Sequence, residues 1–481
     1  MNLSEQLTNP IFRLVGEIAD SMEREVYVVG GFVRDLLLGI PSDDIDFVTV
    51  GSGIELARRV SEALGHHSRL TVFATYGTAQ VVHDGFELEF VGARRESYRR
   101  DSRNPIVEDG TLADDQARRD FTVNAMAICL NADRFGELVD PFDGQGDLQR
   151  RVIRTPLDPD ITFSDDPLRM LRAIRFATRL GFHIVPETFK AIARNSERIT
   201  IITRERINDE LSKIMRTAKP SVGWRLLDMS GLLEFILPQL VALKGVESVD
   251  GHGHKDNFAH TLQVLDQVAA RSDNEWLRWA ALLHDIAKPV TKRYDAHLGW
   301  TFYNHNMVGE KMVGRIFRQM KMPLNDKMKY VAKLVGMHMR PQGVADNGVT
   351  DSGVRRLITD AGSELDDLMT LAEADITSKN PDKVRRQLAG FAALRERMEQ
   401  INDADALRNW KHPINGNEII ERLGLERSVE TGKRIQLLKD AVKEAILEGR
   451  IPYEHDAAWD YMMTLPEAAP DYMAPAAEQA E

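Results

Sequence analysis

The chain has 481 residues, of which 43% are hydrophobic and 28% charged, and its formal net charge is −12. Because this length exceeds one ordinary core, we expect roughly three or four domains. The composition is that of a globular protein, and no apolar run approaches the ~20 residues of a membrane span. The first residues lack the features of a secretory signal, and the single cysteine, Cys129, excludes an intramolecular disulfide and a multi-cysteine zinc site. We therefore expect a cytoplasmic enzyme without a membrane partner.

The first 150 residues alternate short β-rich runs with turn signals, which predicts an α/β or α+β domain. The predicted strands lie in residues 26–31, 45–50, 78–93 and 124–130, and a helix is predicted over 53–65. The polar stretch 98–120 is interpreted as a mobile loop. From about Thr162 to about Leu465 the pattern is helical, and residues 466–481, rich in Pro, Ala and Glu, are predicted to be disordered.

Two adjacent glycines and a D-x-D pattern in "VYVVGGFVRDLLLGIPSDDIDFVTV" predict a phosphate and metal site. Asp44 and Asp46 alternate along a strand and therefore share one face, where two carboxylates repel each other unless a cation lies between them. Such oxygen ligands suit Mg²⁺, which also coordinates substrate phosphates. Gly30-Gly31 lets the backbone approach a phosphate, the next helix offers its N–H groups, and Arg34 can add a charged contact. The alternative is a tight turn, an N-cap aspartate and an exposed strand.

Residues 164–180 have the pattern of a capped helix. Ser164 is a good N-cap, the acidic residues after it suit the positive end of the helix dipole, and Pro167 is acceptable in a first turn. One side is apolar. The charged residues on the helix recur every three positions: Asp166, Arg169, Arg172 and Arg175. By itself this pattern is also typical of a solvated arginine face.

The segment 150–219 is basic, with fifteen lysines and arginines against nine acidic residues in an otherwise acidic chain. A basic segment of this kind is compatible with contacts to a nucleic-acid backbone. It is equally compatible with ordinary solvated helices, so charge alone leaves both interpretations open.

Four stretches together resemble a known family. In chain order they are "VVGGFVRDLLLG…SDDIDFV", "RRDFTVNAMAI" (118–128), "DPFDGQGDL" (140–148) and "DDPLRMLRAIRFATRLGF" (165–182). The chain resembles the class II template-independent nucleotidyltransferases, which comprise the tRNA CCA-adding enzymes and the bacterial poly(A) polymerases. The resemblance implies an α+β fold, with a polymerase-β-like head followed by an all-helical neck, an HD body and a tail. The expected domains are the head (1–150), the neck for nucleotide selection and RNA binding (151–225), the HD body (226–400), the tail (401–465) and the disordered end (466–481).

The resemblance also implies roles for individual residues. Asp44 and Asp46 would be catalytic and bind Mg²⁺, whereas Asp43 should face away and Glu89 is either a third carboxylate or an exposed strand residue. The family's motifs make Asp166 and Arg169 the residues that read the base edge, so that the protein acts as the template. The full set of expected nucleotide-binding residues is Gly31, Arg34, Arg119, Asp166, Arg169, Arg172 and Arg175.

Three neighbouring residues are less specific. Arg118 is as readily a surface charge as a ligand, and Asn124 is more typical of a hydrogen-bonded structural residue. The family often has Glu-Asp where this chain has Asp165-Asp166, which affects only a supporting contact.

A separate group of histidines resembles the HD phosphohydrolase superfamily. Seven of the 13 histidines lie between His252 and His338, and an adjacent His-Asp pair follows an apolar helical run. By this resemblance one divalent metal of unknown identity would be bound by His260, His284, Asp285 and Asp375, with His305 and His338 available for a second. Such a site would hydrolyse phosphate esters or 2′,3′-cyclic phosphates at RNA ends, or would be a structural relic.

The sequence therefore predicts a tRNA nucleotidyltransferase that adds C, C and A from CTP and ATP. Within the family, the alternatives are a poly(A) polymerase or an enzyme that adds only CC or only A. From another class, the alternative is an HD phosphohydrolase whose head docks RNA. The motifs do not separate the family members, and they leave the oligomeric state open.

Overall fold

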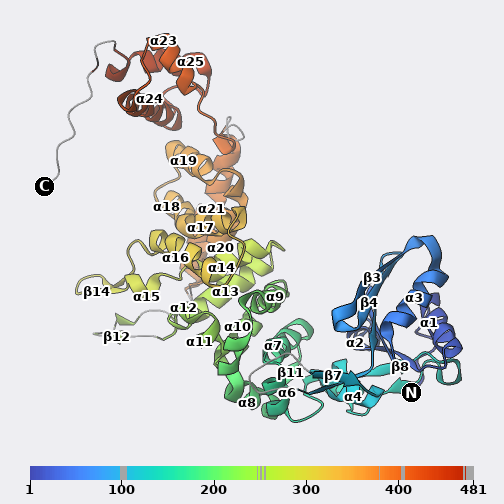
Figure 1. Cartoon of the computed structure of the whole chain (residues 1–481). Helices are drawn as coiled ribbons and strands as arrows, with labels where there is room; N and C mark the ends of the chain where they lie inside the picture. The colour runs from blue at the N-terminus through green and yellow to red at the C-terminus, as the bar shows by residue number, and fades with distance from the viewer. Residues whose placement is uncertain are drawn as a thin grey trace. The chain divides into compact units, whose positions relative to one another are not determined.

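The computed structural model describes the whole chain except residues 98–105, 246–247, 250–251, 254–255, 379, 402–406, 470–471 and 473–481. The chain divides into two compact units, Met1–Ala242 and Leu243–Glu481 (Figure 1). Among the described residues, none of the helices combines the length and apolar character that crossing a bilayer requires.

The first unit is built on a seven-stranded mixed sheet with the order β3-β4-β5-β2-β1-β8-β9. β2 and β5 run parallel, and the other neighbours are antiparallel. The strands are β1 (Val26–Val29), β2 (Asp44–Thr49), β3 (Ser68–Phe73), β4 (Thr78–His83), β5 (Phe86–Gly92), β8 (Ala127–Cys129) and β9 (Leu138–Val139). The strands predicted in 26–31 and 45–50 are confirmed as β1 and β2, the stretch 78–93 forms two strands, β4 and β5, and only 127–129 of the stretch 124–130 form a strand, β8. β3 was not predicted, because this edge strand buries no side chain fully and so shows no clean alternation.

The two faces of β2 have different neighbours. Phe47 stacks on Phe90 of β5, with ring centroids 4.8 Å apart, and lies near Phe12 of the helix α1 (Pro10–Ser21). Val48 points to the opposite face and packs in a cluster with Tyr27, Val29, Ala127 and Leu112. Because Asp44 and Asp46 alternate with the residues of the first face, they project on the second face, as predicted.

Helices surround this sheet and continue beyond it. The predicted helix 53–65 is confirmed as α3 (Gly53–Leu64). The remaining helices are α2 (Gly31–Leu38), α4 (Leu112–Ala117), α5 (Gly144–Arg150), α6 (Pro159–Asp165), α7 (Leu168–Leu180), α8 (Pro186–Asn195), α9 (Arg204–Met215), α10 (Ser221–Met229), α11 (Leu232–Ile236) and α12 (Pro238–Val241). Short strand pairs are β6 (Arg94–Ser97) with β7 (Ile106–Asp109) and β10 (Val152–Ile153) with β11 (His183–Ile184).

The expected helix start at Ser164 is wrong. Ser164 lies inside α6, and Asp166 leaves the helical region with φ −134° and ψ 101° before α7 begins at Leu168. The cause is Pro167, whose ring disfavours a helical conformation in the preceding residue. Asp166 itself accepts a hydrogen bond from the Leu168 N–H at 3.1 Å and so caps α7.

The interpretation of residues 98–120 as a loop is also wrong for its second half. β7 and α4 lie there, and α4 begins with a capping box in which Thr111 and Asp114 bond each other's backbone N–H groups. Residues 98–105 lie outside the described residues.

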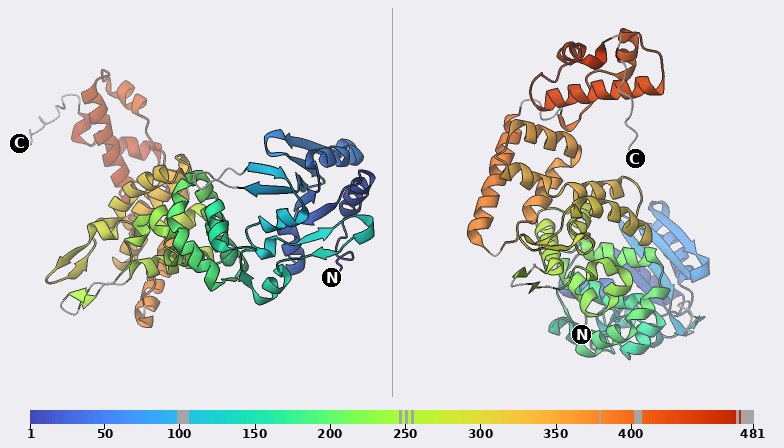
Figure 2. Two further views of the ribbon diagram at one scale, coloured as in Figure 1. Left: turned by 60° about the horizontal axis from the view of Figure 1, so that its bottom comes forward. Right: turned by 90° about the vertical axis from the view of Figure 1, so that its left-hand side faces the viewer.

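The second unit is helical, as predicted. Its helices are α13 (Asn257–Ala269), α14 (Glu275–Leu283), α15 (Lys288–Thr291), α16 (His305–Gln319), α17 (Asp326–Met337), α18 (Arg340–Asp346), α19 (Asp351–Ala361), α20 (Leu365–Ala374), α21 (Pro381–Gln400), α23 (Gly416–Leu423), α24 (Val429–Leu447) and α25 (His455–Met463). Two hairpins interrupt them, β12 (Ser248–Val249) with β13 (His252–Gly253) and β14 (Arg293–Asp295) with β15 (Gly299–Thr301). Figure 2 shows the same elements from two further sides.

The expected disorder from residue 466 onward is wrong for the first residues of that stretch. Pro466–Ala468 form a 3₁₀ turn, and Ala468 is buried in the core made by α23, α24 and α25. Arg434 of α24 holds this turn by donating to the carbonyls of Glu467 and Ala469, each at 2.6 Å. Of the residues after Ala469, only Tyr472 is described.

Candidate active site and metal cluster

A cavity of about 470 Å³ opens in the first unit where β2 begins, and residues of α7 and α9 form part of its wall. Every residue predicted to bind metal or nucleotide in the head and neck lines this cavity. Its lining consists of Gly30, Gly31, Arg34, Asp44, Asp46, Arg118, Arg119, Asp120, Asn124, Asp166, Leu168, Arg169, Arg172, Arg175, Phe176, Arg179 and Arg206. Sequence positions almost 180 residues apart thus meet in one place, although the roles of the individual residues stay predictions.

Asp44 and Asp46 form a carboxylate pair that repels itself. Burial, together with the charges of Asp44 and Glu89, raises the pKa of Asp46 to about 6, although Arg119 opposes this shift. Burial and the charge of Glu87 raise the pKa of Asp44. Glu89 is the parallel partner of Asp46 on β5, and burial and Asp44 raise its pKa as well. Oxygen ligands under mutual repulsion are a donor set that a divalent cation stabilises, so these residues fit Mg²⁺.

The glycine pair leaves room for a ligand to approach the backbone at the N-terminus of α2. Gly30 has φ +73°, and a Cβ there would lie 2.8 Å from an Arg119 guanidinium nitrogen and 3.4 Å from Asp46 Oδ2. A side chain at this position would therefore collide with Arg119. At Gly31 a Cβ would meet only Arg34, at 3.6 Å. The backbone at the start of α2 is thereby left open to the cavity.

Arg34 is braced rather than free. It is buried, donates to both carboxylate oxygens of Asp35 at 2.8 Å and to Asn124 Oδ1 at 2.7 Å. Asn124 in turn donates to Asp120 Oδ1 at 3.0 Å, which confirms its interpretation as a hydrogen-bonded structural residue. Any contact of Arg34 with a phosphate must therefore compete with Asp35 or use the remaining face of the guanidinium.

Asp115 and Asp120 hold the arginines of the second motif and of α7. Burial opposes ionisation of Asp115, but Arg119 and Arg118 keep its pKa below the usual range. Arg119 donates to Asp115 at 3.0 Å, and Arg118 pairs with the same carboxylate. Burial likewise opposes ionisation of Asp120, but Arg172, 2.7 Å away, and Asn124 lower its pKa to about 2. Neither aspartate was assigned from the sequence, although Asp120 lies inside the quoted "RRD" motif.

The residues predicted to read the base lie at the N-terminus of α7. Arg169 donates to the Arg118 carbonyl at 2.7 Å, and Asp166 caps the helix as described above. A third residue, Arg206 of α9, lies 3.8 Å from Asp166 Oδ2. Arg206 could not be predicted as a member of this site, because it lies on an ordinary amphipathic helix 40 positions after Asp166.

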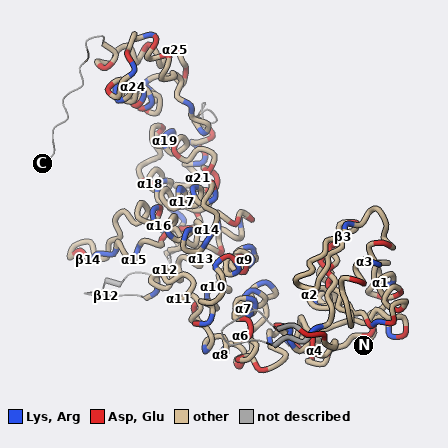
Figure 3. The backbone as a smooth tube through the Cα atoms, in the orientation of Figure 1, with Lys and Arg blue, Asp and Glu red and all other residues tan. Residues whose placement is uncertain are grey.

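Arg175 has a structural partner. It donates to Glu210 of α9 at 2.6 Å, and both side chains are buried. The prediction that Arg175 holds a triphosphate or positions the base-reading pair stays open, and this contact favours positioning. Figure 3 shows how basic residues recur along α7 and α9. With eight arginines against four aspartates in its lining, the cavity suits a polyanion such as a triphosphate.

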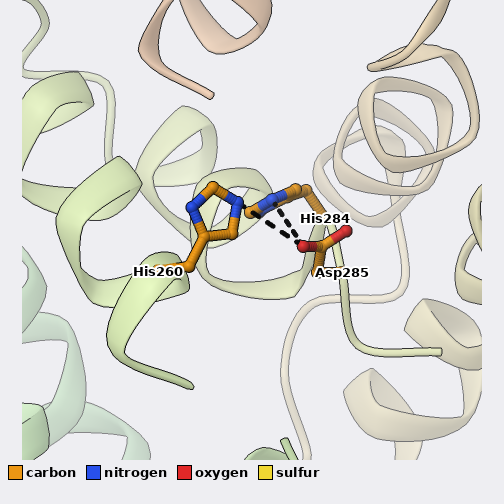
Figure 4. Close-up of side chains that lie close together, drawn as sticks. All are labelled: His260, His284 and Asp285. Carbon is orange, nitrogen blue, oxygen red and sulfur yellow. Dashed lines mark ion pairs between the residues drawn. The ribbon is translucent and has the colours of Figure 1, made fainter. Parts of the chain in front are cut away.

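The histidine cluster of the second unit comes together as predicted. His260, His284 and Asp285 place one ligand atom each within 4.8 Å of one another, and so do Asp285, His305 and His338 (Figure 4 shows the first group). Asp375 joins the first group, with Oδ1 2.8 Å from His260 Nε2 and 3.6 Å from His284 Nε2. Asp285 lies between both groups and is 1% exposed.

Backbone carbonyls orient three of these rings. The Nδ1 atoms of His284, His305 and His338 each lie 2.7–2.8 Å from the carbonyl three residues earlier. The fourth ring, His260, has Nδ1 2.7 Å from Thr377 Oγ1. An Nδ1–H that donates to a carbonyl leaves the Nε2 lone pair for a metal, the usual arrangement around metal-bound histidines.

The cluster fits a divalent metal. His284 Nε2 is buried and makes no hydrogen bond, whereas Asp285 Oδ2 is buried and has the Lys288 ammonium group 2.6 Å away. Burial opposes ionisation of Asp285, but His284 and Lys288 hold its pKa well below the usual range, so it is a carboxylate. A buried ring nitrogen left without a hydrogen bond at the centre of a histidine and carboxylate group is what a metal ion would satisfy.

Comparisons with known proteins match the regions that contain the head cavity and the histidine cluster. Family models match at residues 26–154 (Poly A polymerase head domain), 181–243 (Probable RNA and SrmB-binding site of polymerase A) and 257–379 (HD domain). The A-adding tRNA nucleotidyltransferase of Deinococcus radiodurans is 32% identical over 426 residues, which cover 86% of this chain and 90% of that protein. The chain belongs to the tRNA nucleotidyltransferase family.

Other members of this family differ in the nucleotides that their names mention. The multifunctional CCA protein of Pseudomonas fluorescens Pf-5 is 36% identical over 326 residues, 65% of this chain and 74% of that protein. An A-adding tRNA nucleotidyltransferase of Geobacter sulfurreducens is 38% identical over 265 residues, 54% of this chain but only 28% of that longer protein.

Solved structures of the family share the fold. An apo CCA-adding enzyme superposes with a TM-score of 0.65 at 23% identity, covering 96% of this chain and 97% of that one. A tRNA nucleotidyltransferase solved with a primer tRNA and an incoming ATP analog has a TM-score of 0.55 at 26% identity, covering 79% and 98%. The predicted fold class and family are therefore confirmed, whereas the five domain boundaries stay predictions.

Proposed function

We propose that this tRNA nucleotidyltransferase adds C, C and A to the 3′ ends of tRNA from CTP and ATP, with the protein as template. The observation that carries the proposal is the head cavity, which has Asp44 and Asp46 together with Asp166 and Arg169 in its lining, along with further arginines. A tRNA substrate implies a cytoplasmic enzyme.

In the proposed reaction the tRNA 3′-oxygen attacks the α-phosphorus of the nucleotide, and the bond to the departing pyrophosphate breaks. Asp44 and Asp46 would hold Mg²⁺, which when bound lowers the pKa of the attacking hydroxyl and neutralises charge on the phosphates. The open backbone at Gly30-Gly31 and the guanidinium of Arg119 face the space that the triphosphate needs. These residues position the nucleotide for in-line attack.

Base selection is proposed for Asp166 and Arg169. A carboxylate accepts hydrogen bonds from the exocyclic amino group of cytosine or adenine, whereas guanidinium N–H groups donate to ring nitrogens or a carbonyl. Uracil and guanine present the opposite pattern to at least one of these groups. A mismatched base would leave a buried polar group unpaired, which is the costly outcome that gives selectivity.

The direct test uses purified protein, Mg²⁺ and a tRNA transcript that lacks its terminal CCA. Extension by three nucleotides that requires both CTP and ATP, followed by a stop, supports the proposal. The names of two relatives make an A-only enzyme the specific competitor. That enzyme would extend a transcript ending in CC with ATP but would leave the shorter transcript unchanged, and a long ATP ladder would indicate poly(A) synthesis.

A second activity is proposed for the HD cluster, and the observation that supports it is the convergence of buried histidine and carboxylate ligand atoms within 4.8 Å of one another. His260, His284, Asp285 and Asp375 would hold one divalent metal of unknown identity, with His305 and His338 beside a second. The bound metal would activate water for hydrolysis of a phosphate ester. With a 2′,3′-cyclic phosphate, water adds to phosphorus and one P–O ester bond breaks, which yields a phosphomonoester and a free hydroxyl. Release of a monophosphate from a cyclic nucleotide after metal loading tests this activity.

A further inference from the structure

The segment between the cluster residues Asp285 and His305 carries basic and aromatic side chains. α15 begins three residues after Asp285, and the β14–β15 hairpin connects it to His305 at the start of α16. The hairpin stands out from the neighbouring helices in Figure 1 and in the left view of Figure 2. We name this region the hairpin surface and define it by the residues Lys288, Lys292, Arg293, Trp300, Phe302 and Tyr303.

The base of the hairpin borders the metal cluster. Lys288 Nζ lies 2.6 Å from Asp285 Oδ2 and 5.7 Å from the centre of the Phe302 ring. The Phe302 carbonyl lies 2.8 Å from His305 Nδ1 and so orients a ligand ring. Contacts of the same few residues thus join the hairpin to the proposed metal ligands.

Two side chains at the edge of the cluster are partly exposed, and one of them, Lys288, lies at the base of the hairpin. The side chains of His260, His284, Asp285 and His338 are at most 4% exposed, whereas Lys288 is 19% and Asp375 27% exposed. Among these side chains, a substrate phosphate can therefore reach the cluster beside Lys288, at the base of the hairpin, or beside Asp375 at the end of α20.

The hairpin surface has the composition of a single-strand nucleic-acid platform. Tyr303 is 67% exposed, next to a buried polar site. Lys292 lies over the Trp300 ring at 4.2 Å, and Tyr294 packs edge-on against the same ring. Residues 288–303 contain three basic residues (two lysines and one arginine) and one acidic residue, Asp295. Aromatic faces beside cations bind successive bases and the backbone of a single strand.

We propose that the hairpin surface binds the last few nucleotides of a single-stranded RNA 3′ end and directs its terminal phosphate into the HD cluster. The proposal rests on the hydrolase activity proposed above and names its substrate class. A cyclic mononucleotide would contact only the cluster and Lys288. A longer strand would also stack on Tyr303 and place backbone phosphates against Lys292 and Arg293, so it would bind more tightly.

The first test compares two substrates that end in the same 2′,3′-cyclic phosphate, a mononucleotide and an eight-nucleotide RNA. In Tyr303→Ala and in the double variant K292A/R293A, the KM for the RNA should rise by roughly five- to tenfold, with the KM for the mononucleotide and both kcat values unchanged. The matched control is K329A/R385A, which removes two positive charges that form exposed pairs elsewhere in the same unit. Equal changes for both substrates, or no change for either, would overturn the proposal.

A second test does not depend on hydrolysis. An eight-nucleotide RNA with 4-thiouridine at its penultimate position is irradiated with the full chain, and the crosslinked peptides are mapped. Crosslinks within residues 288–303, lost in Tyr303→Ala, support the hairpin surface, whereas crosslinks confined to other peptides overturn it. If the wild-type protein hydrolyses neither substrate after metal loading, the proposed hydrolase function fails, and this mapping still decides whether RNA binds here. A thermal unfolding curve equal to that of the wild type shows that the second unit of each variant is folded.

Discussion

Asp46 occupies the most unfavourable charged position in the head cavity. Burial and two neighbouring carboxylates raise its pKa to about 6, so in the metal-free protein its negative charge near neutral pH opposes folding. A bound divalent cation would reverse this balance, because it stabilises the same charge. The same buried charge of Asp46 therefore lowers the stability of the metal-free fold and favours binding of a divalent cation.

Asp46→Asn should abolish nucleotide addition while retaining the fold. Loss of one metal-ligating carboxylate removes several kcal/mol of transition-state stabilisation, so we expect a fall of about 10³-fold or more in kcat/KM. The control is Asp43→Asn, which removes the same charge three residues earlier at an exposed position outside the cavity lining. Extension of a CCA-less tRNA at rates within about twofold for both variants would contradict the assignment of Asp46.

Arg206 is a positioning residue that only the folded chain reveals. The backbone N–H of Leu168 holds Asp166 Oδ1 at 3.1 Å, and Arg206 lies 3.8 Å from Oδ2, so both oxygens of the carboxylate are oriented. Arg206→Gln should loosen this orientation and raise misincorporation of UTP and GTP relative to CTP and ATP by roughly tenfold, with Arg206→Lys intermediate. The ratio of kcat/KM values for correct and incorrect nucleotides measures this effect.

A matched control variant distinguishes an effect on nucleotide selection from the general effect of removing one positive charge. Arg194→Gln removes an arginine that pairs with Asp160 on the surface of α8, outside the cavity. Its nucleotide preference should equal that of the wild type. An identical loss of rate with all four nucleotides in Arg206→Gln would show that Arg206 supports binding in general and not selection.

The sequence predicted residues of the head and neck that the structure brings together in the lining of one cavity. Asp44 and Asp46 could be found because alternation along a strand fixes which side chains share a face. Asp115, Arg206 and Glu210 could not, because charged residues on helices are common and only tertiary contacts distinguish a partner from a solvated charge. Arg34 was correctly located in the cavity, but its bidentate bond to the adjacent Asp35 has no signature in the spacing.

At the scale of elements, α7 and α9 are joined by a buried ion pair. Arg175 and Glu210 have side chains that are 9% and 3% exposed, so removing one partner leaves an uncompensated buried charge. Glu210→Leu should destabilise the first unit by about 3–5 kcal/mol, measured by hydrogen exchange of the α7 amides. Asp209→Leu, at the exposed neighbouring position of the same helix, should change stability by about 0.5 kcal/mol or less. Equal protection in both variants would contradict a structural role for the pair.

α24 is contacted by a half-buried histidine, His412, in the segment that precedes α23. His412 Nε2 lies 3.0 Å from the Lys439 carbonyl, and burial together with the Lys439 charge lowers the pKa of His412 below 6.5. As pH falls below 6.5, the unfolded chain takes up a proton that the folded chain resists, so stability is present above this pH and is lost below it. Exchange rates of the α24 amides, corrected for intrinsic pH dependence, should therefore rise from pH 7.5 to 5.5. His412→Gln should show a smaller rise, and an equal rise would contradict the role of His412.

Element boundaries were harder to predict than element types. The periodicity of α7 was evident, but its start was misplaced. Ser164 and the acidic residues after it have the pattern of a helix N-cap, although they form the end of α6. Pro167 carried the decisive signal, since the residue before proline avoids the helical region. α4 was missed although Thr111 and Asp114 form a capping box, because its six residues are too few to show periodicity.

At the scale of the whole molecule, the two candidate sites lie in different compact units and share no residue. The head cavity is lined by arginines and carboxylates, which suit a triphosphate and Mg²⁺. The cluster of the second unit has four histidines and two aspartates, Asp285 and Asp375, which suits a softer divalent metal. Because the two sites have different metal-binding residues and lie in units with separate cores, a substitution that inactivates one site should leave the other active.

Reciprocal variants test this independence. Asp44→Ala with Asp46→Ala should abolish nucleotide addition and leave cyclic-phosphate hydrolysis within about twofold of the wild type, because the second unit keeps its own core and ligands. Asp285→Asn should do the reverse, since it removes the carboxylate that lies between both histidine groups. The content of divalent metals other than Mg²⁺ per chain, measured after dialysis, should fall in Asp285→Asn and stay constant in the head variant. Loss of both activities in either variant would mean that the units act as one enzyme, in which the hydrolase and the transferase depend on a common folded state.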